Sequence, residues 1–178
     1  MPAGKPALKP ASVLLDKKAY GDLAMLVVED AAHMASLVCG ILKSMGVGRI
    51  YEARNGDSAL SILANYPVNV VLIDSLEPPL DGLAVVKTVR TAQAQFPKEV
   101  PVIYMTAQAS KSSVVAARDA GVTEVLSKPF SATQLIARIE SVLKKPRSLV
   151  ESGSFVGPDR RRRENTPRER RRQSDKSE

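Results

Sequence analysis

Four runs of aliphatic residues divide the chain, and polar residues follow each run. They cover residues 23–28, 68–73, 100–105 and 122–127. Near-continuous aliphatic sequence, rather than strict alternation, is typical of strands that are buried on both faces of a parallel sheet. A further strand fits residues 49–53, between Gly48 and the turn sequence Asn55–Gly56. The pattern therefore predicts five buried or half-buried strands.

Between these strands, apolar residues recur at three- and four-residue intervals, the spacing of amphipathic helices. We expect helices at residues 32–45, 58–66, 82–96, 112–121 and 132–144. Ser131 and Gln134 form a capping-box sequence at the start of the last helix. The regular alternation of strand and helix predicts an α/β fold, with a doubly wound five-stranded parallel sheet and helices on both faces.

The charge distribution separates one domain from two extensions. Residues 23–145, the expected domain, carry twelve basic and eleven acidic residues. Residues 1–22 carry four lysines and two acids, and residues 146–178 carry ten basic and six acidic residues, so most of the net charge of +7 lies in the extensions. Both extensions contain too little apolar surface to offset the entropy of ordering. We expect a flexible N-terminal extension and a basic, disordered C-terminal tail.

Several classes of protein do not fit this composition. No apolar stretch approaches the roughly 20 residues of a membrane helix. Prolines interrupt the N-terminus, where a signal peptide would need an apolar core. The single cysteine, Cys39, excludes an intramolecular disulfide framework, and we expect it in the core. These features together predict a cytoplasmic protein.

Polar side chains collect where the expected strands end. Glu29 and Asp30 follow the first strand, Asp74 follows the third, and Thr106 and Lys128 follow the last two. Ligands of open α/β sheets bind beyond the carboxyl ends of the strands. If the first and third strands are neighbours, their ends lie ~5 Å apart. The carboxylates would then repel one another unless a cation shares the site, and oxygen ligands favour Mg²⁺.

The same groups fit phosphoryl transfer. A bound metal neutralises phosphoryl oxygens, and a carboxylate such as Asp74 can act as the nucleophile and become an aspartyl phosphate. Lys128 and Thr106 could complete the charge and the hydrogen bonds around the phosphoryl group. Asp30 has a second interpretation, because acidic residues also favour helix N-termini.

The motifs from about residue 23 to residue 145 resemble the receiver domain of two-component response regulators. The matching pieces are Glu29–Asp30, Asn55–Gly56 with Ala59, Asp74 with Pro78, Asp81 and Gly82, Thr106–Ala107, and Lys128–Pro129–Phe130. The resemblance implies a flavodoxin-like sheet with strand order 2-1-3-4-5. It also implies that Asp74 accepts a phosphoryl group from a histidine kinase or a histidine phosphotransfer protein.

By the same resemblance, Asp30 and Asp74 would bind Mg²⁺ through their carboxylates, Leu76 through its backbone carbonyl and Glu29 largely through water. Thr106 would donate a hydrogen bond to the phosphoryl group.

Lys128 would form an ion pair with the phosphoryl group, and the Lys128–Pro129 peptide bond is cis in many relatives. Two positions depart from the family. Val125 stands where an aromatic residue usually rotates on phosphorylation, and Glu77 adds a carboxylate before Pro78.

The resemblance implies a chemotaxis-type, single-domain response regulator that signals through a downstream protein target. It would be a phosphoacceptor rather than an enzyme, with self-catalysed phosphoryl transfer and slow autodephosphorylation. The 33 residues after residue 145 are too few and too polar for an output domain, so DNA binding is not expected. A phosphorylation-independent adaptor and a phosphate-relay intermediate stay open. An aspartyl phosphatase would need a second aspartate where Leu76 stands.

His33 and the arginine runs of the tail have ordinary interpretations. His33, the only histidine, fits a surface position. The arginine runs at residues 160–163 and 170–172 fit a solvated tail, with docking to a protein partner and binding to nucleic acid or anionic lipid as alternatives. Residues 155–161 resemble a tail motif of some bacterial stand-alone receivers. We expect this tail to begin opposite the polar strand ends.

Overall fold

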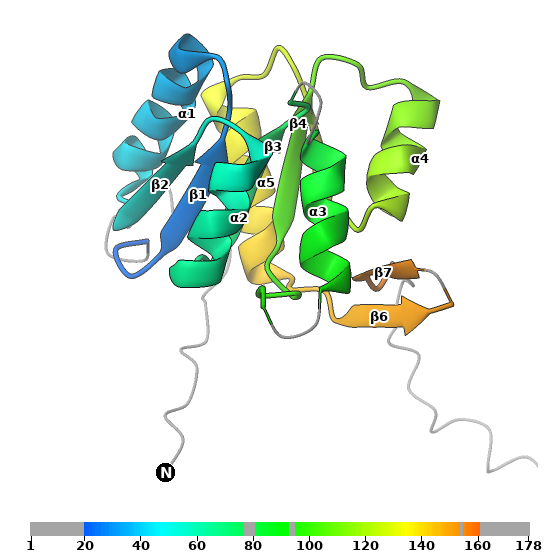
Figure 1. Ribbon diagram of the computed structural model, residues 1–178. Helices are drawn as coiled ribbons and strands as arrows, with labels where there is room; N and C mark the ends of the chain where they lie inside the picture. The colour runs from blue at the N-terminus through cyan, green and yellow to red at the C-terminus, as the bar shows by residue number, and fades with distance from the viewer. Residues whose placement is uncertain (1–19, 77–80, 93–94, 154, 161–178) are drawn as a thin grey trace, which may run out of the picture.

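The computed structural model describes residues 20–76, 81–92, 95–153 and 155–160. Within them, a parallel sheet lies between two layers of helices (Figure 1). The sheet consists of β1 (Ala24–Val28), β2 (Arg49–Ala53), β3 (Val70–Asp74), β4 (Val102–Thr106) and β5 (Glu124–Ser127). The helices are α1 (Ala32–Met45), α2 (Gly56–Asn65), α3 (Gly82–Thr91), α4 (Lys111–Asp119) and α5 (Ala132–Lys144). The order β2-β1-β3-β4-β5, parallel throughout, confirms the predicted fold.

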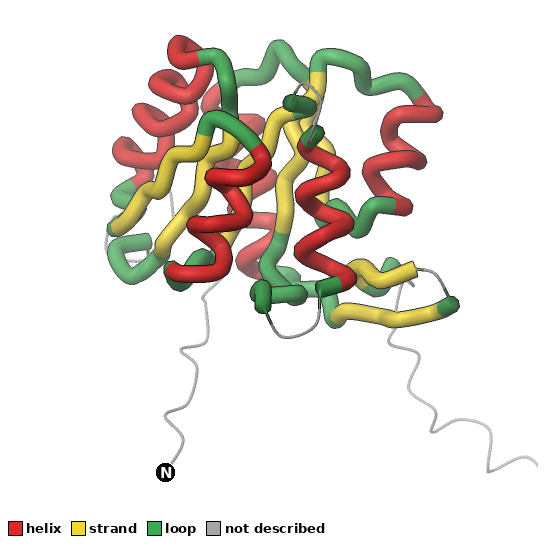
Figure 2. The backbone as a smooth tube through the Cα atoms, in the orientation of Figure 1, coloured by secondary structure: helices red, strands yellow, loops and turns green. Residues whose placement is uncertain are grey.

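Each face of the sheet has its own hydrophobic core, because successive side chains of a strand point to opposite faces. Leu26 and Val28 of β1 pack in the core beneath α2 and α3, whereas Met25 and Val27 pack in the core beneath α1 and α5. Figure 2 shows the two helical layers on either side of the strands. Burial on both faces explains why β1, β3 and β4 are apolar at almost every position.

Local signals place most helix ends. Ser131 and Gln134 form the predicted capping box, with the Gln134 amide donating to Ser131 Oγ over 3.2 Å and the Ser131 amide donating to Gln134 Oε1 over 2.8 Å. Asn55 caps α2 in the same manner through Ser58. Cys39 is buried in the core of α1 and α5, and His33 is exposed, as predicted.

The third helix is shorter than predicted. It ends at Thr91 rather than at residue 96, because Ala92 adopts an extended conformation. Phe96 instead lies in the connection to β4 and packs against the core of α2 and α3. Pro97 follows it, and the residue before a proline disfavours helical geometry.

The expected boundaries of the domain need correction at both ends. Tyr20, assigned to the flexible extension, is buried in the core of α1 and α5, and its hydroxyl donates to Glu140 Oε1 over 3.2 Å. The predicted disorder of the tail is wrong for the antiparallel strands β6 (Leu149–Ser152) and β7 (Phe155–Pro158). Residues 1–19 and 161–178 lie outside the described part of the chain.

The β6–β7 hairpin orders because it packs on the domain rather than on itself alone. Gly157 and Pro158 are buried, and a Cβ atom built on Gly157 would lie 3.0 Å from the Gly121 Cα. As predicted for the start of the tail, the hairpin lies at the end of the sheet opposite the carboxyl ends of the strands (Figure 1).

Arg90 of α3 joins this end of the domain to the core. Its side chain is 1% exposed, Nε donates to the Gly121 carbonyl over 3.1 Å, and Nη1 donates to the Lys98 carbonyl. Burial lowers the pKa of the guanidinium to about 10. Within the described residues, no helix is long and apolar enough to cross a membrane.

Arg90→Ala should lower the free energy of unfolding by about 3 kcal/mol, because it leaves two carbonyls without their donor and opens a cavity. Urea denaturation of the full chain measures this loss. Arg49→Ala, at an exposed position on β2, is the matched control and should change stability by less than about 0.5 kcal/mol. Equal stability of the two variants would contradict a structural role for Arg90.

Candidate functional site

The end of β1 places two carboxylates in different environments. Glu29 is 1% exposed, and its amide donates to the Ala53 carbonyl over 3.0 Å, which extends the pairing of β1 with β2. Its Oε1 accepts a hydrogen bond from the Ala31 amide over 3.3 Å. Asp30 is exposed, and Ala31, without a side-chain cap, is the N-cap of α1. The structure therefore does not support the capping role of Asp30.

Lys128 joins the ends of β1 and β3. Its Nζ lies 2.8 Å from Glu29 Oε2 and 2.9 Å from Asp74 Oδ1. Asp74 is the last residue of β3, which pairs directly with β1, so the sheet order brings these carboxylates to one position. The predicted grouping of the two acids and the lysine is confirmed.

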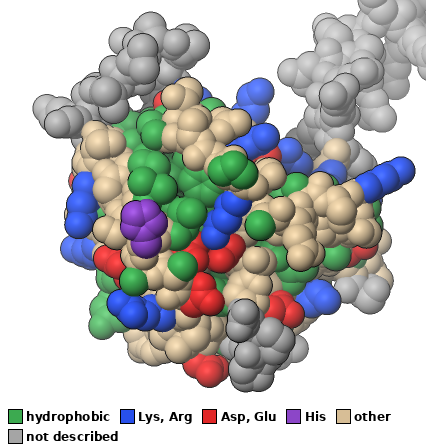
Figure 3. All heavy atoms as spheres, turned by 90° about the horizontal axis from the view of Figure 1, so that it is seen from above, with side chains coloured by type: hydrophobic (Ala, Val, Ile, Leu, Met, Phe, Trp, Pro, Cys, Tyr) green, Lys and Arg blue, Asp and Glu red, His purple; other side chains and the backbone are tan. Residues whose placement is uncertain are grey.

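The carboxylates of Glu29, Asp30 and Asp74 form a group that fits a divalent cation. One oxygen from each lies within 4.8 Å of the others. Figure 3, which looks down on the carboxyl ends of the strands, shows acidic side chains gathered around a basic one. An all-oxygen donor set that includes two accessible carboxylates is the chemistry that Mg²⁺ prefers.

Thr106, the last residue of β4, joins Glu29, Asp30, Asp74 and Lys128 at the carboxyl ends of the strands. We call this group of five residues the rim. Thr106 is 4% exposed and closes the strand beside Asp74, whose register partner is Met105. Thr106 Oγ1 accepts a hydrogen bond from the Gln108 amide over 3.1 Å, and the Thr106 carbonyl accepts one from the Lys128 amide over 2.8 Å. This pairing ties the loop after β4 to the loop after β5.

The start of α3 packs against the backbone of Asp74. Asp81 caps α3 by accepting a hydrogen bond from the Ala84 amide over 2.7 Å. A Cβ atom on Gly82 would lie 2.1 Å from the Asp74 carbonyl oxygen, so only glycine allows this approach. The Asp81–Gly82 sequence therefore sets the distance between α3 and the end of β3.

Burial and the neighbouring charges have opposite effects on the pKa values of Glu29 and Lys128. Burial raises the pKa of the Glu29 carboxyl group, while the hydrogen bond from Lys128 opposes the rise. Burial alone would lower the pKa of Lys128, but its hydrogen bonds to Glu29 and Asp74 leave that pKa above the ordinary value. Lys128 is therefore a cation at neutral pH and offsets the repulsion between the two acids.

Tyr104 is the residue beside this rim that the sequence analysis missed. It is buried in β4, and burial together with the charges of Asp81 and Asp74 raises its pKa, whereas a hydrogen bond with Thr106 opposes the rise. The signal was its position two residues before Thr106, because alternate residues of a strand share a face. Tyr104 is also the register partner of Val125, so the aromatic ring of this face lies on β4 rather than on β5.

The remaining predicted site residues divide into three cases. The Leu76 side chain is buried in the core of α2 and α3, and the metal-binding role of its carbonyl stays a prediction. The Lys128–Pro129 peptide bond is cis, as expected. Glu77 and Pro78 lie outside the described residues.

The chain matches the family model of the response regulator receiver domain over residues 25–140. It is 34% identical over 122 residues to the chemotaxis protein CheY1 of Helicobacter pylori strain 26695, which covers 68% of this chain and 97% of that protein. It is 31% identical to the phosphate regulon transcriptional regulatory protein PhoB of Klebsiella pneumoniae, over 68% of this chain and 52% of the relative.

Solved receiver structures share this fold. The receiver domain of sensor histidine kinase PA1611 from Pseudomonas aeruginosa PAO1, with a magnesium ion coordinated in its active-site cleft, aligns with a TM-score of 0.63 at 26% identity. The alignment covers 69% of this chain and 98% of that domain. The Vibrio cholerae chemotaxis protein CheY4 aligns with a TM-score of 0.62 at 27% identity, covering 67% and 98% of the two chains.

Lys128→Met should raise the pKa of Glu29 further in metal-free buffer, because the hydrogen bond and the charge that lower it are lost. A carboxyl group with a raised pKa in the folded state stabilises the fold at low pH, and this contribution is lost as the pH rises through that pKa. The variant should therefore lose stability more steeply than the parent above about pH 4.5.

Carbon NMR titration of the labelled glutamate side chains measures the pKa directly, with exposed Lys43→Met as the control. An unchanged Glu29 titration in Lys128→Met would show that the ion pair does not govern this carboxyl group.

Proposed function

Because this chain belongs to the response regulator receiver family, we propose that it accepts a phosphoryl group on Asp74 and signals by phosphorylation-dependent binding to another protein. The donor is a phosphohistidine of a histidine kinase or of a histidine phosphotransfer protein. The observation that carries the proposal is the Asp74 carboxylate, 2.9 Å from Lys128 Nζ and grouped with the carboxylates of Glu29 and Asp30.

The transfer is a displacement at phosphorus. An oxygen of Asp74 forms the new bond, and the bond from phosphorus to the histidine nitrogen breaks with its electron pair remaining on nitrogen. Lys128 is positioned to pair with the phosphoryl oxygens, and the Thr106 hydroxyl to donate a hydrogen bond to one of them. Asp30 and Asp74 would hold Mg²⁺, with Glu29 acting largely through water, and the ion would supply neutralising charge to the phosphoryl group.

The chain itself therefore provides the groups that promote its own phosphorylation. We propose self-catalysed transfer and slow autodephosphorylation, without turnover of a separate substrate. An aspartyl phosphatase would need an acid two residues after the nucleophile, and the buried, apolar Leu76 occupies that position. This position supports a phosphoacceptor over a phosphatase.

Two other functions are alternatives to phosphorylation-dependent binding: a phosphorylation-independent adaptor and a phosphate relay. Val125 leaves β5 without the aromatic side chain that relatives rotate, which favours a phosphorylation-independent adaptor as an alternative. Tyr104 weakens that argument, because it supplies a buried aromatic ring on the neighbouring strand, beside Thr106. A relay that passes the phosphoryl group to a second histidine would use the same site residues.

Asp74→Asn should abolish phosphorylation by a small phosphodonor such as acetyl phosphate in the presence of Mg²⁺, because an amide is a far poorer nucleophile. Mass spectrometry of the intact chain follows the added phosphoryl group. Asp57→Asn, on the exposed first turn of α2, is the matched control and should be labelled like the parent. Undiminished labelling of Asp74→Asn would assign the acceptor to another residue.

Saturating Mg²⁺ should raise the melting temperature of the parent, because a cation that binds the folded site stabilises the folded state. Asp30→Asn should weaken Mg²⁺ binding at least tenfold, since it removes one of two accessible carboxylates. Differential scanning fluorimetry across a Mg²⁺ titration tests both expectations. A melting temperature independent of Mg²⁺ in the parent would rule out this metal site.

A further inference from the structure

The C-terminal end of α4 is held by an arginine from beyond the hairpin. Arg160 Nη2 donates to the Arg118 carbonyl over 3.2 Å and to the Val122 carbonyl over 2.9 Å. Both carbonyls belong to the last turn of α4 and the loop that follows it, where cations are favoured by the helix dipole. Residues outside the family match thus cap a helix inside it.

The turn between α4 and β5 packs against both β7 and α3. Gly121 has φ +92°, and a Cβ atom there would lie 2.8 Å from the Val156 carbonyl oxygen and 2.9 Å from Arg90 Cγ. The Gly121 carbonyl accepts the hydrogen bond from Arg90 Nε. The turn is therefore packed between α3 and β7, and neither neighbour leaves room for a side chain.

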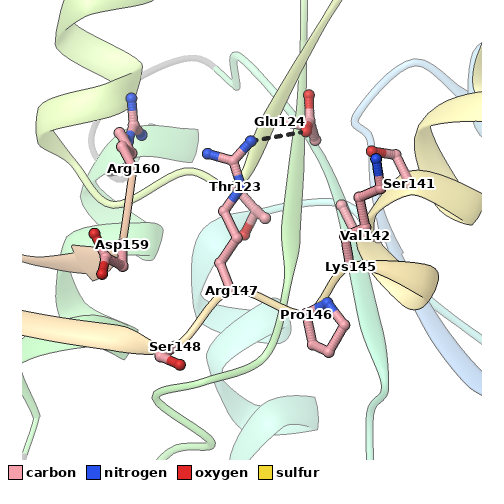
Figure 4. Close-up of a pocket in the computed structure, with 10 residues that line it drawn as sticks. All are labelled: Thr123, Glu124, Ser141, Val142, Lys145, Pro146, Arg147, Ser148, Asp159 and Arg160. Atoms are coloured by element: carbon pink, nitrogen blue, oxygen red, sulfur yellow. Dashed lines mark ion pairs between the residues drawn. The ribbon is translucent and has the colours of Figure 1, made fainter. Parts of the chain in front are cut away.

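Ion pairs and a backbone hydrogen bond hold the base of the hairpin. The Asp159 amide donates to the Ser148 carbonyl over 2.7 Å, Lys98 Nζ lies 3.9 Å from Glu151 Oε1, and Arg147 lies 3.5 Å from Glu124. Figure 4 shows the Arg147–Glu124 pair and Arg160 around a cavity between the hairpin ends, β5 and the end of α5.

Two features of Arg160 weaken this attachment. Arg160 Nε is buried without a hydrogen-bond partner among the described residues, which costs free energy. Burial, followed by the charges of Arg118 and Arg147, lowers the pKa of Arg160. The charges of Asp119 and Glu124 act in the opposite direction. The hydrogen bonds that hold Arg160 are thus opposed mainly by desolvation, and we expect this contact to open locally.

The N-terminal end of α4 lies next to the rim. Ser110 caps α4, and the preceding Gln108 donates its amide to Thr106 Oγ1. Only Ala117 of α4 is buried, whereas Val114 and Val115 are 39% and 44% exposed. The helix is therefore attached mainly at its ends, one at the phosphoryl site and one at the hairpin.

We propose that the β6–β7 hairpin and Arg160 form a clamp on α4 that opens when Asp74 is phosphorylated, so that the rim controls the position of the C-terminal segment. The inference rests on the proposed function. In this structure the clamp is closed, Lys128 Nζ pairs with the Asp74 carboxylate, and Thr106 Oγ1 accepts the hydrogen bond from the Gln108 amide. A phosphoryl group that accepts a hydrogen bond from the Thr106 hydroxyl would draw Thr106 toward Asp74, and the Gln108 amide bound to the same oxygen would follow at the start of the α4 segment. By linkage, opening the clamp favours the phosphorylated state and strengthens binding of a phosphoryl mimic.

Hydrogen–deuterium exchange of the full chain, with and without Mg²⁺ and beryllium trifluoride as a phosphoryl mimic, tests the proposal. The mimic should slow exchange around Asp74 and Thr106 and accelerate it in residues 118–122 and 149–158. Rim protection without faster exchange of the hairpin would overturn the clamp alone. Absence of rim protection would overturn the proposed function, and the clamp with it.

Variants test the reciprocal direction. Arg160→Gln should accelerate hairpin exchange about fivefold without the mimic and tighten mimic binding about fivefold. Gly157→Ala should act alike, because its Cβ would lie 3.0 Å from the Gly121 Cα. Arg49→Gln and Gly40→Ala, at exposed positions on β2 and α1, are the matched controls and should match the parent. Unchanged mimic affinity in both Arg160→Gln and Gly157→Ala would overturn the proposal.

Discussion

The position of the Lys128 ammonium group, between the carboxylates of Glu29 and Asp74, is the interaction on which the rest of the site depends. The parallel sheet brings β1 and β3 side by side, and this order alone would bring like charges together. A cation at their midpoint offsets the repulsion. Because Lys128 follows β5 and donates its amide to the Thr106 carbonyl, the same residue also ties the far side of the rim to its acidic centre.

The three carboxylates differ in burial, and this difference divides their roles. Glu29 is enclosed and holds Lys128, while Asp30 is open to solvent. Asp74 lies between these extremes, close enough to Lys128 for an ion pair and accessible enough for a partner to reach. In the proposed function, Asp74 would therefore take the phosphoryl group while Glu29 keeps its contact with Lys128.

The opposite end of the sheet shows how an extension becomes part of a domain. Arg90, Gly121 and the β6–β7 hairpin pack together where α3, α4 and β5 meet, and Arg160 completes the contact. Since α4 runs from this contact to the loop after Thr106, two distant ends of the molecule share one loosely packed helix. The hairpin thus gives this receiver a feature that its family match does not include.

The sequence by itself determined the sheet, most helix boundaries and the acidic rim, because each depends on local features. Strand burial produces aliphatic runs, helices show their periodicity, and residues that follow parallel strands must meet at one edge. Asp74 and Lys128 could be placed at the same edge of the sheet in advance for this reason.

Tertiary structure alone decided the placement of Arg90 and the hairpin. The hairpin contains apolar residues such as Leu149, Val150, Phe155 and Val156, but it lies in a basic, polar extension, and its ordering depends on surfaces supplied by Gly121 and α3. The burial of Arg90 likewise depends on carbonyls that lie 8 and 31 residues away. Such contacts leave no periodic trace in the chain, because they are made between surfaces that exist only after the sheet has formed.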